Sequence, residues 1–105
     1  MRGFGRFSQP AALVLLSLLA GEKHGYAIGD DIERLTGERP GPGTLYGAIA
    51  RLEERGLIES TGSSVRRRPY RLTDAGQAAA CAEADRIAAL AREISIRLRA
   101  RESLA

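Results

Sequence analysis

The segment PGTLYGAIARLEER, Pro42–Arg55, carries the strongest structural signal in this 105-residue chain. Its large apolar side chains recur every three or four residues, at Leu45, Ile49 and Leu52. This spacing predicts a helix with one apolar face. Pro42 suits the first turn of a helix, and Gly56 is a common residue just after a last turn. The outward face is then expected to carry small and polar residues, namely Thr44, Gly47 and Arg51.

The residues before this segment predict a partner helix. From His24 to about Leu35 the apolar residues again have helical spacing, at Ala27, Ile28, Ile32 and Leu35. The charged residues among them are expected to face water: Asp30, Asp31, Glu33 and Arg34. Pro40 and Gly41 then prevent this helix from continuing. Two helices joined by such a connector predict a helix-turn-helix, whose second helix lies in the major groove of duplex DNA.

The residues after the segment predict a β-hairpin with a basic tip. Leu57–Ser60 and Pro69–Leu72 are expected to be extended, with Pro69 at a strand start or an unpaired edge position. The stretch Ser60–Leu72 holds no acidic residue, and its tip includes Arg66, Arg67 and Arg68. Guanidinium groups there can bind phosphates or enter a narrow minor groove. Alone, such a run is more often a solvated loop, but beside a helix-turn-helix it favours a DNA-contacting wing.

The two ends of the chain complete the predicted architecture. Residues 1–9 are expected to form a loose arm, and Ala11–Ala20 an apolar helix that is buried on most sides. From Thr73 to about Arg101 a long helix is expected, with a heptad-like seam of Ala80, Ala84, Ile87, Ala91, Ile94 and Leu98. The seam either packs on the chain's own core or pairs with a second copy, and its length and small residues favour pairing. The predicted fold is mainly α (α+β), with a winged helix-turn-helix at residues 10–73 and a dimerisation helix at 74–105.

Composition narrows the function classes. The net charge of +3 and the pI of about 9.6 suit a polyanionic partner without requiring one. The single histidine and single cysteine, His24 and Cys81, lie far apart in sequence, so we expect no metal site and no cofactor. We expect His24 to cap or pack at a helix start, and Cys81 to be a small buried apolar residue rather than a redox sensor.

The same inventory argues against an enzyme and against a membrane partner. The sequence offers no nucleophile–base pair and no phosphate-binding glycine motif. The apolar run at residues 11–20 is too short to cross a bilayer. A lone cysteine forms no intrachain disulfide and suits a reducing compartment, so a cytoplasmic location is expected.

Several short motifs, in this order and spacing, make the chain resemble the PadR family of winged-helix regulators. They are His24–Ile28, Pro42–Tyr46, Leu52–Ile58 and Arg67–Gly76, together with the apolar run Leu15–Leu19. The resemblance covers roughly residues 10–80. It implies dimers formed through helices outside the DNA-binding motif, and repression of genes until a ligand or stress releases the protein. Two residues depart from the family's pattern: Gly47, where a larger residue or proline is common, and Pro69, where a polar residue is usual.

These observations yield a specific set of expected contacts. The expected DNA-contacting residues are Tyr26, Gly43, Thr44, Tyr46, Gly47, Arg51, Arg66, Arg67 and Arg68. The expected dimer contacts are Leu15, Leu19, Ile87, Ala91, Ile94 and Leu98. For Tyr46 two interpretations stay open: its hydroxyl reaches a phosphate, or its ring is a half-buried packing residue.

Two further alternatives concern function. A winged helix can serve as a protein-interaction module without reading DNA, but that would require an apolar or acidic outward face at Pro42–Arg55. A small-molecule effector is possible by resemblance. Some relatives hold flat aromatic compounds between stacked tryptophans, and this chain contains no Trp. An effector would therefore need a pocket lined by Leu, Ile and Ala.

Overall fold

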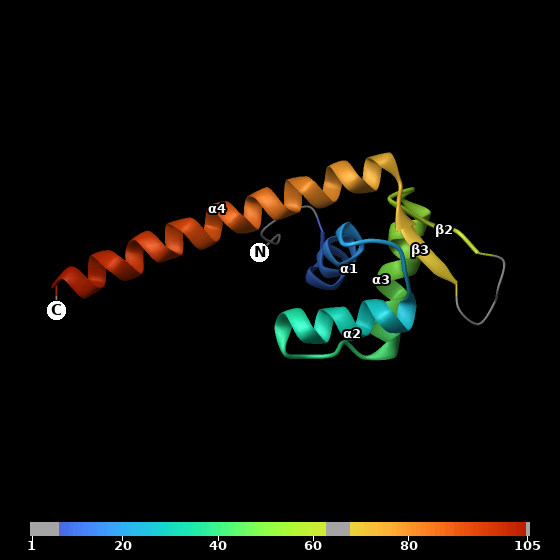
Figure 1. Cartoon of the computed structure of the whole chain (residues 1–105), viewed down its shortest axis with the longest axis horizontal. Coiled ribbons are helices and arrows are strands. Elements are labelled where there is room, and N and C mark those ends of the chain that lie inside the picture. The colour runs from blue at the N-terminus through green and yellow to red at the C-terminus, as the bar shows by residue number, and fades with distance from the viewer. Residues whose placement is uncertain (1–6, 63–67, 105) are drawn as a thin grey trace.

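The computed structural model describes residues 7–62 and 68–104. The elements follow one another as α1 (Gln9–Leu19), β1 (Lys23–His24), α2 (Gly25–Thr36), α3 (Pro42–Glu54), β2 (Ile58–Ser60), β3 (Pro69–Leu72) and α4 (Asp74–Leu104). In Figure 1, α1, α2, α3 and the strands form one body, and α4 runs away from it toward the C-terminus. The fold is the mainly α winged helix-turn-helix with a long C-terminal helix that the sequence predicts.

The helix ends of the central motif follow from local chemistry. His24 caps α2, because the backbone N–H of Ala27 donates to its Nδ1 at 3.4 Å, which confirms the expected capping role. Gly37 ends α2 with a φ of +84°, a left-handed conformation that glycine adopts without strain. Gly56, with a φ of +73°, follows α3 in the same way. The start of α2 and the ends of α2 and α3 are therefore set by single residues that can be recognised in the sequence.

The sheet has one more strand than the sequence predicts. Its order is β1-β3-β2, with all pairs antiparallel. The hairpin of β2 and β3 is as expected, and Pro69 is the first residue of its strand. β1 lies just before α2, where the sequence predicts no strand, and it pairs Lys23 with Tyr70 and His24 with Pro69. A strand of two residues is too short to show a periodic pattern. It is recognised only from its pairing with β3, which lies far along the chain.

The core lies where α1 crosses the other helices. Its members are mostly the predicted apolar residues, including Val14, Leu18, Ile28, Ile32, Leu45, Ile49, Leu52 and Ile58. Two expectations need correction. Leu15 is 0% exposed and belongs to this core, so it offers no surface to a second chain. Leu35, expected on the buried face of α2, is 60% exposed, because the apolar face of that helix ends at Ile32.

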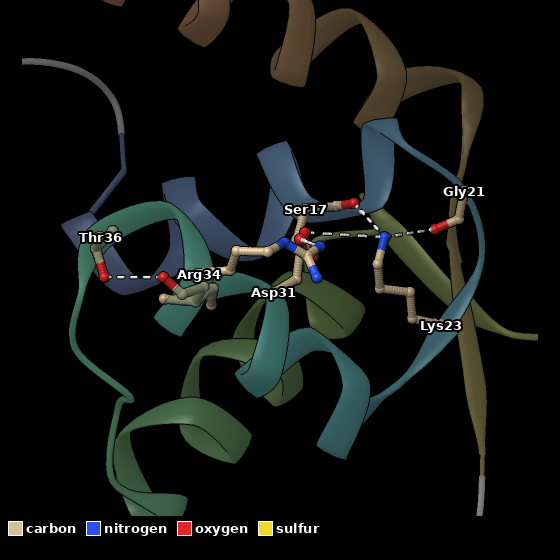
Figure 2. A network of polar contacts seen from close by, with 7 residues as sticks. Ser17, Gly21, Lys23, Asp31, Arg34 and Thr36 are labelled. Atoms are coloured by element: carbon tan, nitrogen blue, oxygen red, sulfur yellow. Dashed lines mark hydrogen bonds and ion pairs between the residues drawn. The ribbon is translucent and has the colours of Figure 1, made fainter.

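A buried ionic network joins α1 to α2, and Figure 2 shows it. Asp31, expected to face water, is only 7% exposed. The Ser17 hydroxyl donates to its Oδ2 at 2.7 Å, and Arg34 donates to its Oδ1. Lys23 Nζ lies 3.9 Å from the same carboxylate and donates to the Ser17 carbonyl at 2.7 Å. The network thereby fastens α1, β1 and α2 to one another.

This network predicts a pH-dependent contribution to stability. The Ser17 hydrogen bond, and then the charges of Lys23 and Arg34, hold the pKa of Asp31 below its ordinary value, although burial opposes them. A lowered folded-state pKa stabilises the fold at neutral pH, and the contribution is lost as pH falls below about 4. Ser17→Ala should therefore reduce the free energy of unfolding at pH 7 by about 1.5–3 kcal/mol, the usual worth of a hydrogen bond to a charged group.

Urea unfolding at pH 7 and at pH 3 tests this prediction. The loss in Ser17→Ala should shrink at pH 3, because the unfolded chain is largely protonated below the ordinary pKa of an aspartate and much of the gain from the lowered folded-state pKa of Asp31 is then lost. Ser95→Ala, at an exposed position of α4, is the matched control and should change little at either pH. An equal loss at both pH values would mean that Ser17 acts by packing and not through Asp31.

α4 is anchored at its first turns and exposed beyond them. The Thr73 hydroxyl donates to the Gly56 carbonyl at 2.7 Å, and Gly76 N–H donates to that hydroxyl at 3.0 Å. Buried positions of α4 are Gly76, Ala80 and Glu83. Cys81 lies on this helix but is exposed, so the expectation that it is a buried apolar residue is wrong. None of the described helices is both long enough and apolar enough to cross a membrane.

Candidate nucleic-acid interface

α3 presents the expected division between a buried and an exposed face. Its buried residues are Leu45, Ala48, Ile49 and Leu52. Thr44 and Arg51 are exposed on the other side, and Gly47 is half-buried. A β-carbon added at Gly47 would lie 3.5 Å from Nη1 of Arg51, so the Arg51 side chain runs back over that glycine. The exposed centre of α3 is therefore covered by a guanidinium group and not left bare.

The first turn of α3 is open to an incoming group. Gly41 is its N-cap and makes no side-chain capping hydrogen bond. The first amides of a helix have no partner within the helix, and they favour an anion such as a phosphate. Gly43 has no atom within 4 Å of the place where a β-carbon would stand. Nothing in the described part of the chain therefore blocks a close approach to the backbone at Gly43.

Tyr46 combines packing with exposure. Its ring lies against Gly25 at the start of α2, where an added β-carbon would stand 2.6 Å from the ring atom Cε1. Even so, the residue remains 48% exposed. The ring thus packs on the start of α2, and the exposed part of the side chain stays available for another contact.

Tyr26 lies on the same side of the molecule and is 64% exposed. Arg39, from the connector between α2 and α3, places its guanidinium carbon 4.5 Å from the centroid of the Tyr26 ring. Tyr26, Tyr46 and Arg39 line one shallow groove together with Pro42 at the start of α3. The sequence analysis missed Arg39, because its partners lie 9 and 13 residues earlier and no local spacing relates them.

The wing is described only in part. Arg68 is exposed just before β3, whereas Arg66 and Arg67 lie outside the described residues. Arg71 is engaged within the sheet, with its guanidinium 3.5 Å from the carboxylate of Glu59 on β2. Of the three arginines expected at the wing tip, Arg68 is thus the one whose position and exposure the structure describes.

Most exposed large apolar residues on the outer part of α4 follow one side of the helix, although Ile96, about 200° around from Ile94, is exposed as well. Those predicted from the seam are Ile87, Ala91, Ile94 and Leu98, and all are exposed. Leu90, which the sequence analysis did not include, is exposed beside them, and Leu19 of α1 is also exposed. In the described residues no group of three or more His, Cys, Asp or Glu side chains is placed to hold a metal ion.

Comparison with known proteins gives a consistent picture. Residues 14–82 match the profile of the transcriptional regulator PadR-like family. The transcriptional regulator Rv3488 of Mycobacterium tuberculosis (strain ATCC 25618 / H37Rv) is 41% identical over 76 residues, which cover 70% of each chain. An uncharacterized 37.1 kDa protein in transposon TN4556 of Streptomyces fradiae is 47% identical over 72 residues, covering 69% of this chain but only 21% of that protein.

Solved structures share the fold. The crystal structure of a PadR family transcription regulator from hypervirulent Clostridium difficile R20291 is similar with a TM-score of 0.71. The two chains are 24% identical, and the match covers 87% of this chain and 99% of that one. At this level of identity the likeness concerns the fold alone.

Proposed function

Because the chain belongs to the PadR-like family of transcriptional regulators, and is therefore not an enzyme, we propose that it is a repressor that binds a pseudo-palindromic operator as a homodimer. The observation that carries this proposal is the exposed face of α3. Thr44 and Arg51 are exposed beside an uncapped first turn, while the opposite face is buried in the core. This face is neither apolar nor acidic, which favours DNA over a protein partner.

Each exposed group has a role in the proposed complex. α3 enters the major groove, where Thr44 and Arg51 contact base edges. Gly43 allows the backbone to come close to the DNA, and Gly47 leaves room for the Arg51 side chain that lies over it. Tyr26 and Tyr46 donate their hydroxyls to phosphates. The wing arginines contact the backbone or the minor groove, and they are Arg66, Arg67 and Arg68.

Arg51→Ala and Arg68→Ala should separate base reading from phosphate binding. The operator is first selected from a random duplex library by the wild-type protein. Arg51→Ala should then lower discrimination at one or two positions by about 1–3 kcal/mol, since a good side chain–base contact has that worth. Arg68→Ala should weaken binding to all sequences alike and reduce the slope of log K against log salt by about one, as for a lost phosphate contact.

Titrations of operator and scrambled duplexes at several salt concentrations provide the measurement. Arg92→Ala, at an exposed arginine on α4, controls for the general loss of one positive charge. If Arg51→Ala and Arg68→Ala changed affinity and specificity in the same way, the division of roles would be wrong. If the wild type selected no sequence at all, the proposed DNA reading would fail.

The homodimer supports this function through geometry. A two-fold axis would place two copies of α3 about one helical turn of DNA apart, which suits a pseudo-palindromic site. The proposed contacts are Ile87, Ala91, Ile94 and Leu98 of α4, with Leu19 of α1. Leu15 is left out of this set, because it is buried in the core of its own chain. Repression itself is tested by a reporter gene placed behind the selected operator.

A further inference from the structure

Arg39 is the most connected residue of the link between α2 and α3. It donates from Nη2 to the backbone carbonyl of Tyr26 at 3.1 Å, and its guanidinium lies over the ring of the same residue. It also pairs with Asp30, and its Nη1 lies 3.7 Å from the carboxylate of Glu33. In Figure 1 the connector between α2 and α3 runs back along α2 toward the start of α3.

α2 has a space that fits this guanidinium. Gly29 is buried, and a β-carbon added there would stand 2.8 Å from Nη2 of Arg39. The same added atom would lie 3.2 Å from Cδ2 of Leu45 on α3. The glycine therefore lets the arginine lie flat on α2 at a point where α3 also packs.

The charge of Arg39 is already compensated within the chain. Asp30 and Glu33 flank it, and the hydrogen bond to Asp30 raises the pKa of Arg39. Both carboxylates are more than half exposed, so these ion pairs add little to the stability of the fold. The positive charge of Arg39 is therefore already shared with two carboxylates of its own chain. The contacts of Arg39 instead fix geometry.

We propose that Arg39 is a positioning residue of the DNA-binding surface, which holds the connector on α2 and orients the Tyr26 ring beside the first turn of α3. The groove it shares with Tyr26, Pro42 and Tyr46 places it between the two helix starts that face the DNA in the proposed complex. This inference rests on the proposed function. It assigns Arg39 an action on affinity through Tyr26 and α3, without a contact of its own to the DNA.

Two substitutions distinguish positioning from direct phosphate binding. Arg39→Met removes charge and stacking, whereas Arg39→Lys keeps the charge and removes the planar group. Both should lower affinity for the selected operator roughly three- to thirtyfold, the range expected when a supporting contact modulates binding. The slope of log K against log salt should stay at the wild-type value in both. Arg92→Met, on α4, is the control for loss of an exposed arginine and should leave affinity nearly unchanged.

A double-mutant cycle with Tyr26→Leu adds a second test. If Arg39 acts through Tyr26, the affinity lost in the double variant should be smaller than the sum of the losses in Arg39→Met and in Tyr26→Leu. A readout in the free protein accompanies the cycle. The δ-methylene protons of Arg39 should be shifted upfield by the Tyr26 ring in NMR spectra, and the shift should vanish in Tyr26→Leu.

The outcomes separate this inference from the function beneath it. If Arg39→Met lowers the salt slope by about one and Arg39→Lys restores binding, Arg39 is a phosphate ligand and the inference is wrong. If both variants bind as tightly as the wild type, Arg39 positions nothing. If the wild type binds no duplex, the proposed function fails, and the inference fails with it whatever the NMR spectra show.

Discussion

Gly76→Ala is expected to lower the free energy of unfolding by about 3 kcal/mol or more, at the upper end of the cost of overpacking. A β-carbon at this position would stand 1.7 Å from the carbonyl oxygen of Leu57 and 2.8 Å from its carbonyl carbon. These are backbone atoms, and no rotation of a side chain can relieve the overlap. The N–H of Thr73 donates to the same carbonyl oxygen at 3.1 Å, so moving Leu57 also breaks that bond.

The damage should spread from the first turn of α4 to the core. Ala80, one turn after Gly76, is 0% exposed and packs in the main core. A displacement of the first turn of α4 would therefore also move Ala80 out of the core. Urea unfolding followed by far-UV circular dichroism measures the loss in the free energy of unfolding. A Gly76→Ala chain that does not fold even without urea would be the extreme form of the expected result. Gly43→Ala is the matched control, because the space around that residue is empty.

Gly43→Ala should be neutral or stabilising by less than about 1 kcal/mol, since alanine is the better helix former. A Gly76→Ala protein that unfolds at the same urea concentration as the Gly43→Ala protein would contradict the close docking of α4 on Leu57. Far-UV spectra of the two folded proteins should otherwise match.

Ile94→Glu is expected to separate the proposed dimer and to weaken operator binding roughly hundredfold or more, since the second half-site contact becomes independent of the first. Ile94 is exposed on the outer part of α4, where no described residue after Arg86 is buried. A carboxylate placed in an apolar contact between two helices loses its water at a large cost in free energy. The fold of the single chain should be unaffected, because this part of α4 does not contribute to the core.

Sedimentation at micromolar concentration and operator titration measure the two effects. Ala89→Glu is the charge-matched control, since it lies five residues earlier and about 140° around the helix. It should remain dimeric and bind as the wild type does. A wild-type protein that sediments as a monomer, or an Ile94→Glu protein that stays dimeric, would overturn the proposed interface.

Local pattern was sufficient for the main elements of the fold. The spacing of Leu45, Ile49 and Leu52 predicted α3, and Pro42 and Gly56 placed its ends within a residue or so. The spacing of apolar residues likewise predicted α2, and the two extended stretches Leu57–Ser60 and Pro69–Leu72 predicted the hairpin. The exposure of Thr44 and Arg51 followed from the same periodicity, because a helix that buries one face must present the other.

Features that depend on distant partners were beyond such patterns. Leu19 and Leu15 belong to the same apolar helix, yet one is exposed and the other fully buried. The difference arises from which neighbouring elements cover α1. The sequence did not point to Arg39 for a related reason. Its contacts with α2 exist only because the connector folds back on that helix.

Local spacing predicted the order of the helices and the buried face of α3, since each depends on residues within a few positions of one another. Three other features arise from packing between distant segments: Asp31 is buried against Ser17, Lys23 and His24 pair with β3, and Gly76 touches Leu57. Periodicity measures how side chains are arranged around one element. Burial and pairing depend on what other elements bring to that place, and this information is spread over residues far apart in the chain.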